Sequence, residues 1–169
     1  MKIEYTPIGI VHCRPLTTPG NPPFQSMFSP VNGTIEVYPE FVAGLKAVKG
    51  FSHLIILCHF DRAQKQALTE QPLMDGNDQH GIFATRHFNR PNPIGIAYVR
   101  LEKIENGTLF VSGLDLLDNT PVLDIKPYIP AFDCIPDAVP GWVTPEHIGR
   151  MKAVCRNVCG DEKARDTKP

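Results

Sequence analysis

Apolar and β-branched residues along this chain fall into short runs, and several of these runs alternate with polar residues. Thr34–Tyr38 alternates in this way after Asn32-Gly33, a dipeptide typical of a tight turn. Phe51–Phe60 contains the continuous apolar run Leu54–Leu57, which is typical of a strand buried on both faces. The pattern therefore predicts strands as the main elements of the fold.

The most specific hairpin signal is Asn106-Gly107, which lies between two strand-like runs, Gly95–Glu105 and Thr108–Leu114. Ile3–His12 and Pro121–Ile125 are further strand candidates. Many short strands with turn residues between them are typical of antiparallel sheets that close or curve. We expect a mostly β protein, an antiparallel β-barrel or a strongly curved sheet, with functional loops at one rim.

Helical signal is confined to two places. Glu40–Val48 predicts one or two turns, and Thr144-Pro145 is typical of a helix start. Apolar residues then recur at steps of three and four up to Gly160: Ile148, Met151, Cys155 and Val158. We expect a β-barrel domain over residues 1–142, a short C-terminal helix over 143–160 and a disordered tail over 161–169.

Composition narrows the cellular context. The chain has 169 residues, and its apolar (42%) and charged (21%) fractions are ordinary for a single globular domain. Its net charge of -1 gives no global basic field, so any RNA contact would need a local patch such as Arg86, Arg90 and Arg100. No apolar leader or membrane-length run is present, and five scattered cysteines suit free thiols, so we expect a cytoplasmic protein with no membrane partner.

One loop stands out for its chemistry. Between Gly81 and Gly95, the apolar residues Ile82–Ala84 predict the end of a buried strand, and two arginines, a histidine and two asparagines follow within Arg86–Asn92. Pro91 and Pro93 restrict the backbone, so the loop has few conformations to lose on binding. This combination predicts a ligand site in the segment between Gly81 and Gly95, here called the proline-stiffened loop.

A second polar cluster occupies Asp115–Tyr128. Asp118-Asn119 is typical of an ordinary turn. Asp124 and Lys126 share a strand face, where a solvated ion pair is as compatible with the pattern as a role in a site. Taken together with the proline-stiffened loop, the cluster favours a site with carboxylates facing a cationic or hydroxyl-bearing ligand.

Other chemistry is less well supported. His12-Cys13 and Cys58-His59 are adjacent pairs within strands, so their side chains point to opposite faces and we expect no metal site. Neither a strained Gly-x-Ser-x-Gly elbow nor a glycine-rich nucleotide loop is present. His53 and His59 are interpreted as core or rim histidines, and Trp142 as an anchor for the connection to the C-terminal helix.

Three long motifs resemble the TsaA-like (TrmO) family: Gly81–Arg86, Arg90–Gly95 and Asp115–Tyr128. Two shorter stretches, Ile8–Val11 and Gly50–Leu54, match the family as well, and the resemblance covers about residues 3–142. Characterised members are S-adenosylmethionine-dependent tRNA methyltransferases. The resemblance implies a single-sheeted antiparallel β-barrel and a homodimer, with S-adenosylmethionine bound at the barrel rim near the subunit interface.

By motif position, the resemblance implies a set of cofactor contacts: Pro23, Phe24, Gln25, Asp61, Arg62, Arg86, Ile96, Asp115, Leu116, Leu117 and Asp118. The sequence departs from bacterial members in two places. Phe24 stands where they commonly carry an arginine, and Asp61-Arg62 stands where they carry His-Gln. Many bacterial members also continue into a further C-terminal domain.

The activity implied is methylation of the exocyclic nitrogen of threonylcarbamoyladenosine beside the tRNA anticodon. Asp118 and Asp115 are the candidate carboxylates for the sulfonium, while Asp124 or the pair Lys126 and Tyr128 are candidates to orient the acceptor. Arg90 and Asn92 are the candidate contacts to RNA. Two other functions stay open: a non-catalytic S-adenosylmethionine-sensing module, and a methyltransferase of a small metabolite.

Overall fold

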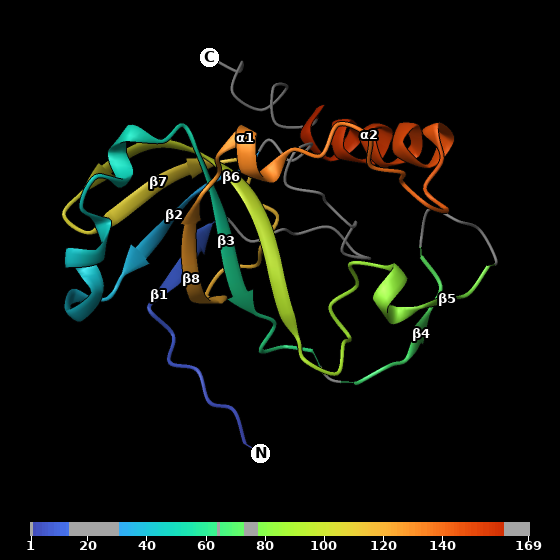
Figure 1. Cartoon of the computed structure of the whole chain (residues 1–169), viewed down its shortest axis with the longest axis horizontal. Coiled ribbons are helices and arrows are strands. Elements are labelled where there is room, and N and C mark those ends of the chain that lie inside the picture. The colour runs from blue at the N-terminus through green and yellow to red at the C-terminus, as the bar shows by residue number, and fades with distance from the viewer. Residues whose placement is uncertain (1, 14–30, 64, 73–77, 161–169) are drawn as a thin grey trace, which may run out of the picture.

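Six antiparallel strands form a closed barrel in the order β1-β2-β7-β6-β3-β8 (Figure 1). The computed structural model describes residues 2–13, 31–63, 65–72 and 78–160, the last without the side chains of 154–160. The barrel strands are β1 (Gly9–Cys13), β2 (Asn32–Val37), β3 (His53–His59), β6 (Ile94–Glu105), β7 (Thr108–Ser112) and β8 (Pro121–Pro127). The predicted single-sheeted antiparallel β-barrel is confirmed.

Alternation of side chains builds the core. In β3, Leu54, Ile56 and Cys58 are fully buried inside the barrel, whereas Ile55 and Leu57 between them are only half-buried. The prediction of a strand buried on both faces was therefore wrong, because one face of β3 lines the interior and the other lies on the outer wall. The central cluster draws on the strands and on the loop before β8: Val11, Ile35, Val37, Leu54, Ile56, Cys58, Ala97, Val99, Leu109, Val111, Leu114, Leu116 and Val122.

Turn chemistry accounts for the β6–β7 hairpin. Asn106 and Gly107 have φ values of 49° and 81°, as a type I′ turn requires, and this predicted hairpin is confirmed. Asn32-Gly33 was predicted as a turn but lies within β2, paired with β1 and β7. A Cβ at Gly33 would come within 2.7 Å of the His12 carbonyl oxygen, so this glycine allows close strand approach.

Short helical segments lie in the connection from β2 to β3 and in the chain after β8. The predicted turns over Glu40–Val48 are 3₁₀ helices at Pro39–Leu45 and Val48–Gly50. After β8 come α1 (Pro130–Asp133) and α2 (Pro145–Gly160), the predicted C-terminal helix. Thr144 begins α2, since its Oγ1 accepts a hydrogen bond from the His147 amide (3.3 Å) and its own amide donates to His147 Nδ1 (3.2 Å).

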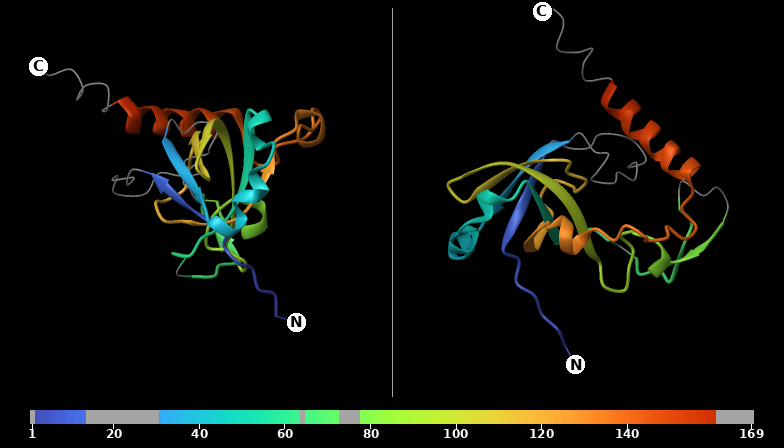
Figure 2. Two further views of the ribbon diagram at one scale, coloured as in Figure 1. Left: turned by 90° about the vertical axis from the view of Figure 1, so that its left-hand side faces the viewer. Right: turned by 45° about the horizontal axis from the view of Figure 1, so that its top comes forward.

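A small lobe stands apart from the barrel wall, at the same end of the molecule as α2 (Figures 1 and 2). It contains β4 (Thr69–Glu70) paired with β5 (His80–Gly81). Ile82–Ala84 forms a 3₁₀ turn, so the expected end of a buried strand was wrong. A single apolar side chain, Ile82, buries there while Phe83 is 78% exposed.

Trp142 ties this lobe to the start of α2. Its Nε1 donates to the Ala84 carbonyl at 2.8 Å, and its ring stacks on His80 with centroids 4.3 Å apart. The interpretation of Trp142 as an anchor agrees with these contacts. Within the described residues, no helix has the length and apolar character needed to cross a membrane.

Gly95 provides a test of core packing. A Cβ at Gly95 would overlap the Phe60 ring and lie 2.6 Å from Cys58 Sγ, whereas a Cβ at Gly44 would meet no atom within 4 Å. We expect Gly95→Ala to lower the free energy of unfolding by about 1–3 kcal/mol, as overpacking usually does. Urea denaturation measures this change in the free energy of unfolding, with Gly44→Ala as the matched control. Equal losses in the two variants would contradict this account of the core.

Candidate functional site

The segment Gly113–Thr120, here called the rim loop, connects β7 to β8 at one end of the barrel. Gly113 and Asn119 have positive φ values of 79° and 63°, which turn the chain sharply at both ends of the loop. Leu114 and Leu116 are buried in the core at 0% and 3% exposure. Burial of these two side chains leaves the intervening polar positions and the backbone of the loop to form a site.

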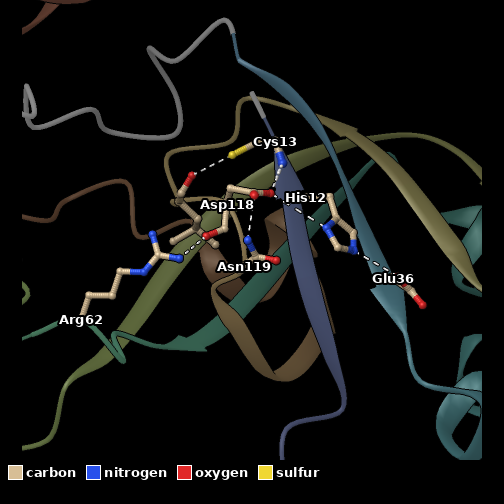
Figure 3. A network of polar contacts seen from close by, with 7 residues as sticks. His12, Cys13, Glu36, Arg62, Asp118 and Asn119 are labelled. Atoms are coloured by element: carbon tan, nitrogen blue, oxygen red, sulfur yellow. Dashed lines mark hydrogen bonds and ion pairs between the residues drawn. The ribbon is translucent and has the colours of Figure 1, made fainter. Parts of the chain in front are cut away.

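Asp118 lies at the centre of a polar network on the rim (Figure 3). Its Oδ1 accepts a hydrogen bond from the Cys13 amide at 3.1 Å, and its Oδ2 accepts one from Asn119 Nδ2 at 2.8 Å. His12 lies on the far side, with Nδ1 3.9 Å from Asp118 Oδ1 and Nε2 3.0 Å from Glu36 Oε2. The carboxylate is thus oriented by groups from the end of β1 and from the rim loop itself, and His12 links it to Glu36 on β2.

Arg62 reaches the same loop from the segment that follows β3. A tight turn there, in which the Ala63 amide donates to the Phe60 carbonyl at 3.0 Å, precedes the lobe. Arg62 Nη2 donates to the backbone carbonyl of Asp118 at 2.7 Å (Figure 3). The adjacent Asp61 is exposed. Two of the predicted cofactor contacts, Arg62 and Asp118, are therefore brought into direct contact.

Cys13 makes a second contact with the rim loop. Its Sγ donates to the Leu116 carbonyl at 3.3 Å. Burial raises the pKa of the Cys13 thiol, the Asp118 carboxylate adds to that increase, and Arg62 opposes it. Since the thiol stays protonated at neutral pH, Cys13 acts here as a hydrogen-bond donor.

Asp115 lies close to the core thiol Cys58. Burial raises the pKa of Cys58 to about 12, and the nearby Asp115 carboxylate contributes while the Gly95 backbone hydrogen bond opposes the shift. Asp115 Oδ1 is a buried oxygen that accepts no hydrogen bond within the described part of the chain, although Asp115 makes another polar interaction there. Asp115 therefore contributes negative charge beneath the rim.

The proline-stiffened loop is held by its own polar groups. Arg90 Nη1 donates to the carbonyls of Thr85 (2.7 Å) and His87 (3.4 Å), so part of this guanidinium is engaged within the loop. The Asn92 carbonyl accepts a hydrogen bond from the Ile94 amide at 2.7 Å. Arg86 is exposed and has polar contacts of its own.

This loop also packs along the segment that carries Arg62. The Phe60 amide donates to the Pro93 carbonyl at 2.8 Å, and Gln66 Nε2 donates to the Pro91 carbonyl at 3.3 Å. Contacts therefore run from the proline-stiffened loop, through the segment after β3, to the rim loop.

Four other predicted site residues lie on the outer wall of the barrel. In the sheet, Ile96 and Asp124 lie opposite Leu57, and Lys126 lies opposite Ile55. Leu57 and Ile55 are outward-facing residues of β3. The Tyr128 ring packs edge-on against Tyr98, an outward-facing neighbour on β6, with centroids 6.0 Å apart. Among the described residues, no hydrogen bond or ion pair joins this outer wall group, Ile96, Asp124, Lys126 and Tyr128, to the Asp118 network.

Within the outer wall group, Lys126 Nζ and Asp124 Oδ2 are 2.6 Å apart, and both side chains are substantially exposed. The interpretation of these two residues as a solvated ion pair agrees with this geometry. The remaining predicted cofactor residues, Pro23, Phe24 and Gln25, lie outside the described residues.

Sequence reasoning considered His12 and Cys13 only as metal ligands and did not consider Glu36. His12 and Cys13 contact the rim loop, and Glu36 contacts His12, because β1 pairs with both β2 and β8, and the Val11 amide donates to the Thr120 carbonyl at 3.0 Å. No local sequence pattern predicts this strand pairing. No group of three or more His, Cys, Asp or Glu in the described ranges could hold a metal ion.

The fold defines the class of protein: a closed antiparallel β-barrel with polar loops at one rim. It is similar to a crystal structure of TrmO from Pseudomonas aeruginosa, with a TM-score of 0.68 and 39% sequence identity over 83% of this chain and 62% of that one. Another crystal structure of TrmO gives a TM-score of 0.69 and 38% identity over 86% of this chain and 64% of that one.

Sequence comparisons identify the family. Residues 11–134 match the family model of the tRNA-methyltransferase O N-terminal domain. A probable S-adenosyl-L-methionine-binding protein of Pyrococcus abyssi is 44% identical over 98% of this chain and 84% of its own length. A tRNA (adenine(37)-N6)-methyltransferase of Eikenella corrodens is 46% identical over 54% of this chain and 56% of its own. The chain belongs to the tRNA-methyltransferase O family, whose named relatives include S-adenosylmethionine-dependent methyltransferases.

The share of each relative that this chain spans differs. This chain spans most of the length of the Pyrococcus protein, under two thirds of the length of the two TrmO chains and about half the length of the Eikenella enzyme. Structural similarity to TrmO therefore concerns the barrel domain and the segments attached to it.

Cys58 links the core to alkaline stability. Its pKa in the folded protein is about 12, above the ordinary value of 9.0, so the unfolded chain loses this proton first as pH rises. The stabilising contribution is complete below pH 9 and is lost toward pH 12, at up to about 1.4 kcal/mol per pH unit. We expect the free energy of unfolding, measured with urea from pH 8 to 11, to fall less steeply in Cys58→Ala than in the unmodified protein.

The control for this measurement is Cys134→Ala, because Cys134 is an exposed free cysteine. This variant should keep the slope of the unmodified protein. If the Cys58→Ala slope also matched the unmodified protein, burial of the Cys58 thiol would not affect alkaline stability as argued.

Proposed function

We propose that this protein transfers a methyl group from S-adenosylmethionine to the exocyclic nitrogen of a modified adenosine, threonylcarbamoyladenosine, beside the tRNA anticodon. The observation that carries the proposal is the rim loop: it contains the Asp115–Asp118 motif, and tertiary contacts join it to Arg62 and Cys13. Relatives are named as S-adenosyl-L-methionine-binding proteins and as tRNA (adenine(37)-N6)-methyltransferases, which supports the cofactor and a tRNA adenosine as the acceptor.

The donor and acceptor groups at the rim fit this cofactor. A sulfonium and a ribose favour carboxylate and carbonyl oxygens, and Asp118 and the rim-loop backbone supply both. A guanidinium such as Arg62 or Arg86 suits the carboxylate of the amino-acid end. When bound, S-adenosylmethionine supplies an activated methyl group.

The residues of the chain contribute mainly by position and charge. Methyl transfer is an in-line displacement, so correct placement of donor and acceptor provides much of the rate enhancement. The Asp118 carboxylate is held by the Cys13 amide and by Asn119, and this limits its motion before any ligand arrives. Asp118 is therefore the first candidate for a residue that contacts the cofactor.

We also propose a homodimer, because the outer wall leaves large apolar side chains exposed. Ile94 and Ile96 on β6 are 42% and 39% exposed, and they continue the outward face that carries the outer wall group. A second copy packed on this face would bury them and would bring Asp124, Lys126 and Tyr128 to a subunit interface. That arrangement would reconcile the two groups of predicted site residues, which one subunit does not bring together.

Contact with tRNA is assigned to the proline-stiffened loop. Arg86 is exposed, and Arg90 and Asn92 stiffen the same loop by the hydrogen bonds described above. Cationic side chains on a rigid loop can pair with phosphates without ordering the loop first. Because the chain carries a net charge of -1, this local patch would have to supply the RNA attraction.

The function is tested by transfer of labelled methyl from S-adenosylmethionine to tRNA that carries threonylcarbamoyladenosine, compared with tRNA that lacks it. We expect label in the first tRNA only. Asp118→Asn should lower kcat/KM roughly 10- to 100-fold, the range for losing a hydrogen bond to a charged group. Glu105→Gln is the control, since Glu105 pairs with Lys103 at an exposed hairpin.

Other outcomes separate the alternatives. Cofactor binding in calorimetry without label in either tRNA would indicate a sensing module or a different acceptor. Absence of both binding and transfer would contradict the assignment of the rim loop to S-adenosylmethionine.

The oligomeric state provides a separate test. Analytical ultracentrifugation should give twice the mass of one chain, and replacing both Ile94 and Ile96 by Glu should give the mass of a single chain, because charges would then be buried. Ile3→Glu, at a residue 61% exposed in the segment before β1, should leave the mass unchanged. A single-chain mass for the unmodified protein would rule out the proposed dimer.

A further inference from the structure

The end of β1 holds both ends of the short segment Leu116–Asp118. Cys13 Sγ donates to the Leu116 carbonyl at 3.3 Å, and the Cys13 amide donates to Asp118 Oδ1 at 3.1 Å (Figure 3). One residue thus contacts two residues that are more than 100 positions away in the sequence. The geometry of this segment is consequently set by a tertiary contact as well as by its own turn.

We propose that Cys13 is a positioning residue of the cofactor site, which fixes the Leu116 carbonyl and the Asp118 carboxylate relative to each other. The inference rests on the proposed function, in which these two acceptor groups face S-adenosylmethionine. Cys13 acts through them and need not touch the cofactor itself.

The surroundings of Cys13 restrict where its side chain can lie. On the β2 side, Gly33 has no side chain, and a Cβ there would come within 3.2 Å of Cys13 Cβ. On the other side, the Leu116 side chain is buried in the core at 3% exposure, so its carbonyl cannot move far. Gly33 therefore leaves the room that Cys13 needs beside β2, and the Leu116 carbonyl that accepts from the thiol is held in place by its buried side chain.

The chemistry of the group also fits a donor. The Cys13 thiol faces a carbonyl oxygen and a nearby carboxylate, both of which disfavour a thiolate in this place, and Arg62 offsets them only in part. The burial and the Asp118 charge that raise its pKa keep the proton on sulfur at neutral pH. A nucleophilic or metal-binding role would require the opposite, a lowered pKa.

Two variants separate the hydrogen bond from simple packing. Cys13→Ala removes the donor, and Cys13→Ser keeps a donor of similar size. We expect Cys13→Ala to raise the Kd for S-adenosylmethionine, measured by calorimetry, by about two- to tenfold, the effect of losing one neutral hydrogen bond. Cys13→Ser should restore the Kd to within about twofold of the unmodified protein, because a hydroxyl donates at least as well as a thiol.

The matched control is Cys134→Ala, since Cys134 is an exposed cysteine whose amide donates to the Pro130 carbonyl at the end of α1. It should leave the Kd unchanged. Equal Kd values for Cys13→Ala and the unmodified protein would overturn the proposal, and so would a failure of Cys13→Ser to restore binding while the protein remains folded.

A measurement without cofactor keeps the proposal separate from the proposed function. The carbonyl ¹³C chemical shift of Leu116 reports the hydrogen bond that this oxygen accepts, and NMR of the ligand-free protein measures it. We expect this shift to change in Cys13→Ala and to return toward the original value in Cys13→Ser. An unchanged shift in Cys13→Ala would overturn the proposal, whereas a changed shift in a protein that does not bind S-adenosylmethionine would overturn only the function assigned to the site.

Discussion

Closure of the barrel between β1 and β8 is the contact on which the rest of the site depends. Gly9 pairs with Val122 and Ile10 with Pro121, and the Val11 amide donates to the Thr120 carbonyl. These strands are separated by most of the barrel domain in sequence, so their pairing has to be supported by the packed interior. Once it forms, the end of β1 lies against the rim loop that leads into β8, and the polar network around Asp118 follows.

Apolar burial and polar geometry reinforce one another in the rim loop. Burying a leucine side chain contributes roughly 1.5–3 kcal/mol, which is more than a neutral hydrogen bond contributes on balance. Leu114 and Leu116 therefore set where the loop runs, and the weaker contacts from Cys13, Asn119 and Arg62 orient its polar groups. A site built in this way is ordered before ligand arrives, because the same side chains that fill the core also fix the loop.

The separation of the rim network from the outer wall group affects how the protein would work. The rim network and the outer wall group lie on different parts of the barrel, and the outer wall combines an ion pair with exposed isoleucines. If two copies associate through that wall, each site would combine a rim of one subunit with groups near the interface. The barrel would then contribute both a rigid frame and the surface that completes the site.

Local patterns in the sequence determined much of the architecture. Alternating apolar residues, the Asn106-Gly107 turn and the Thr144 helix start depend on neighbours within a few residues, and these predictions were confirmed. Errors arose where the same local signal suits two structures. Asn32-Gly33 lies inside a strand because two neighbouring strands approach closely there, and Ile82–Ala84 is a 3₁₀ turn with one buried side chain.

The motifs of the sequence also singled out Asp118 and Arg62 as site residues, but only the tertiary structure joined them to each other and to Cys13, His12 and Glu36. It likewise placed Asp124 and Lys126 on the outer wall, because strand register decides which face a side chain occupies. Register and barrel closure depend on contacts between residues far apart in the chain. No local pattern encodes those contacts, so the sequence indicated some of the candidate residues, whereas the fold decided which of them lie together and added His12, Cys13 and Glu36 to them.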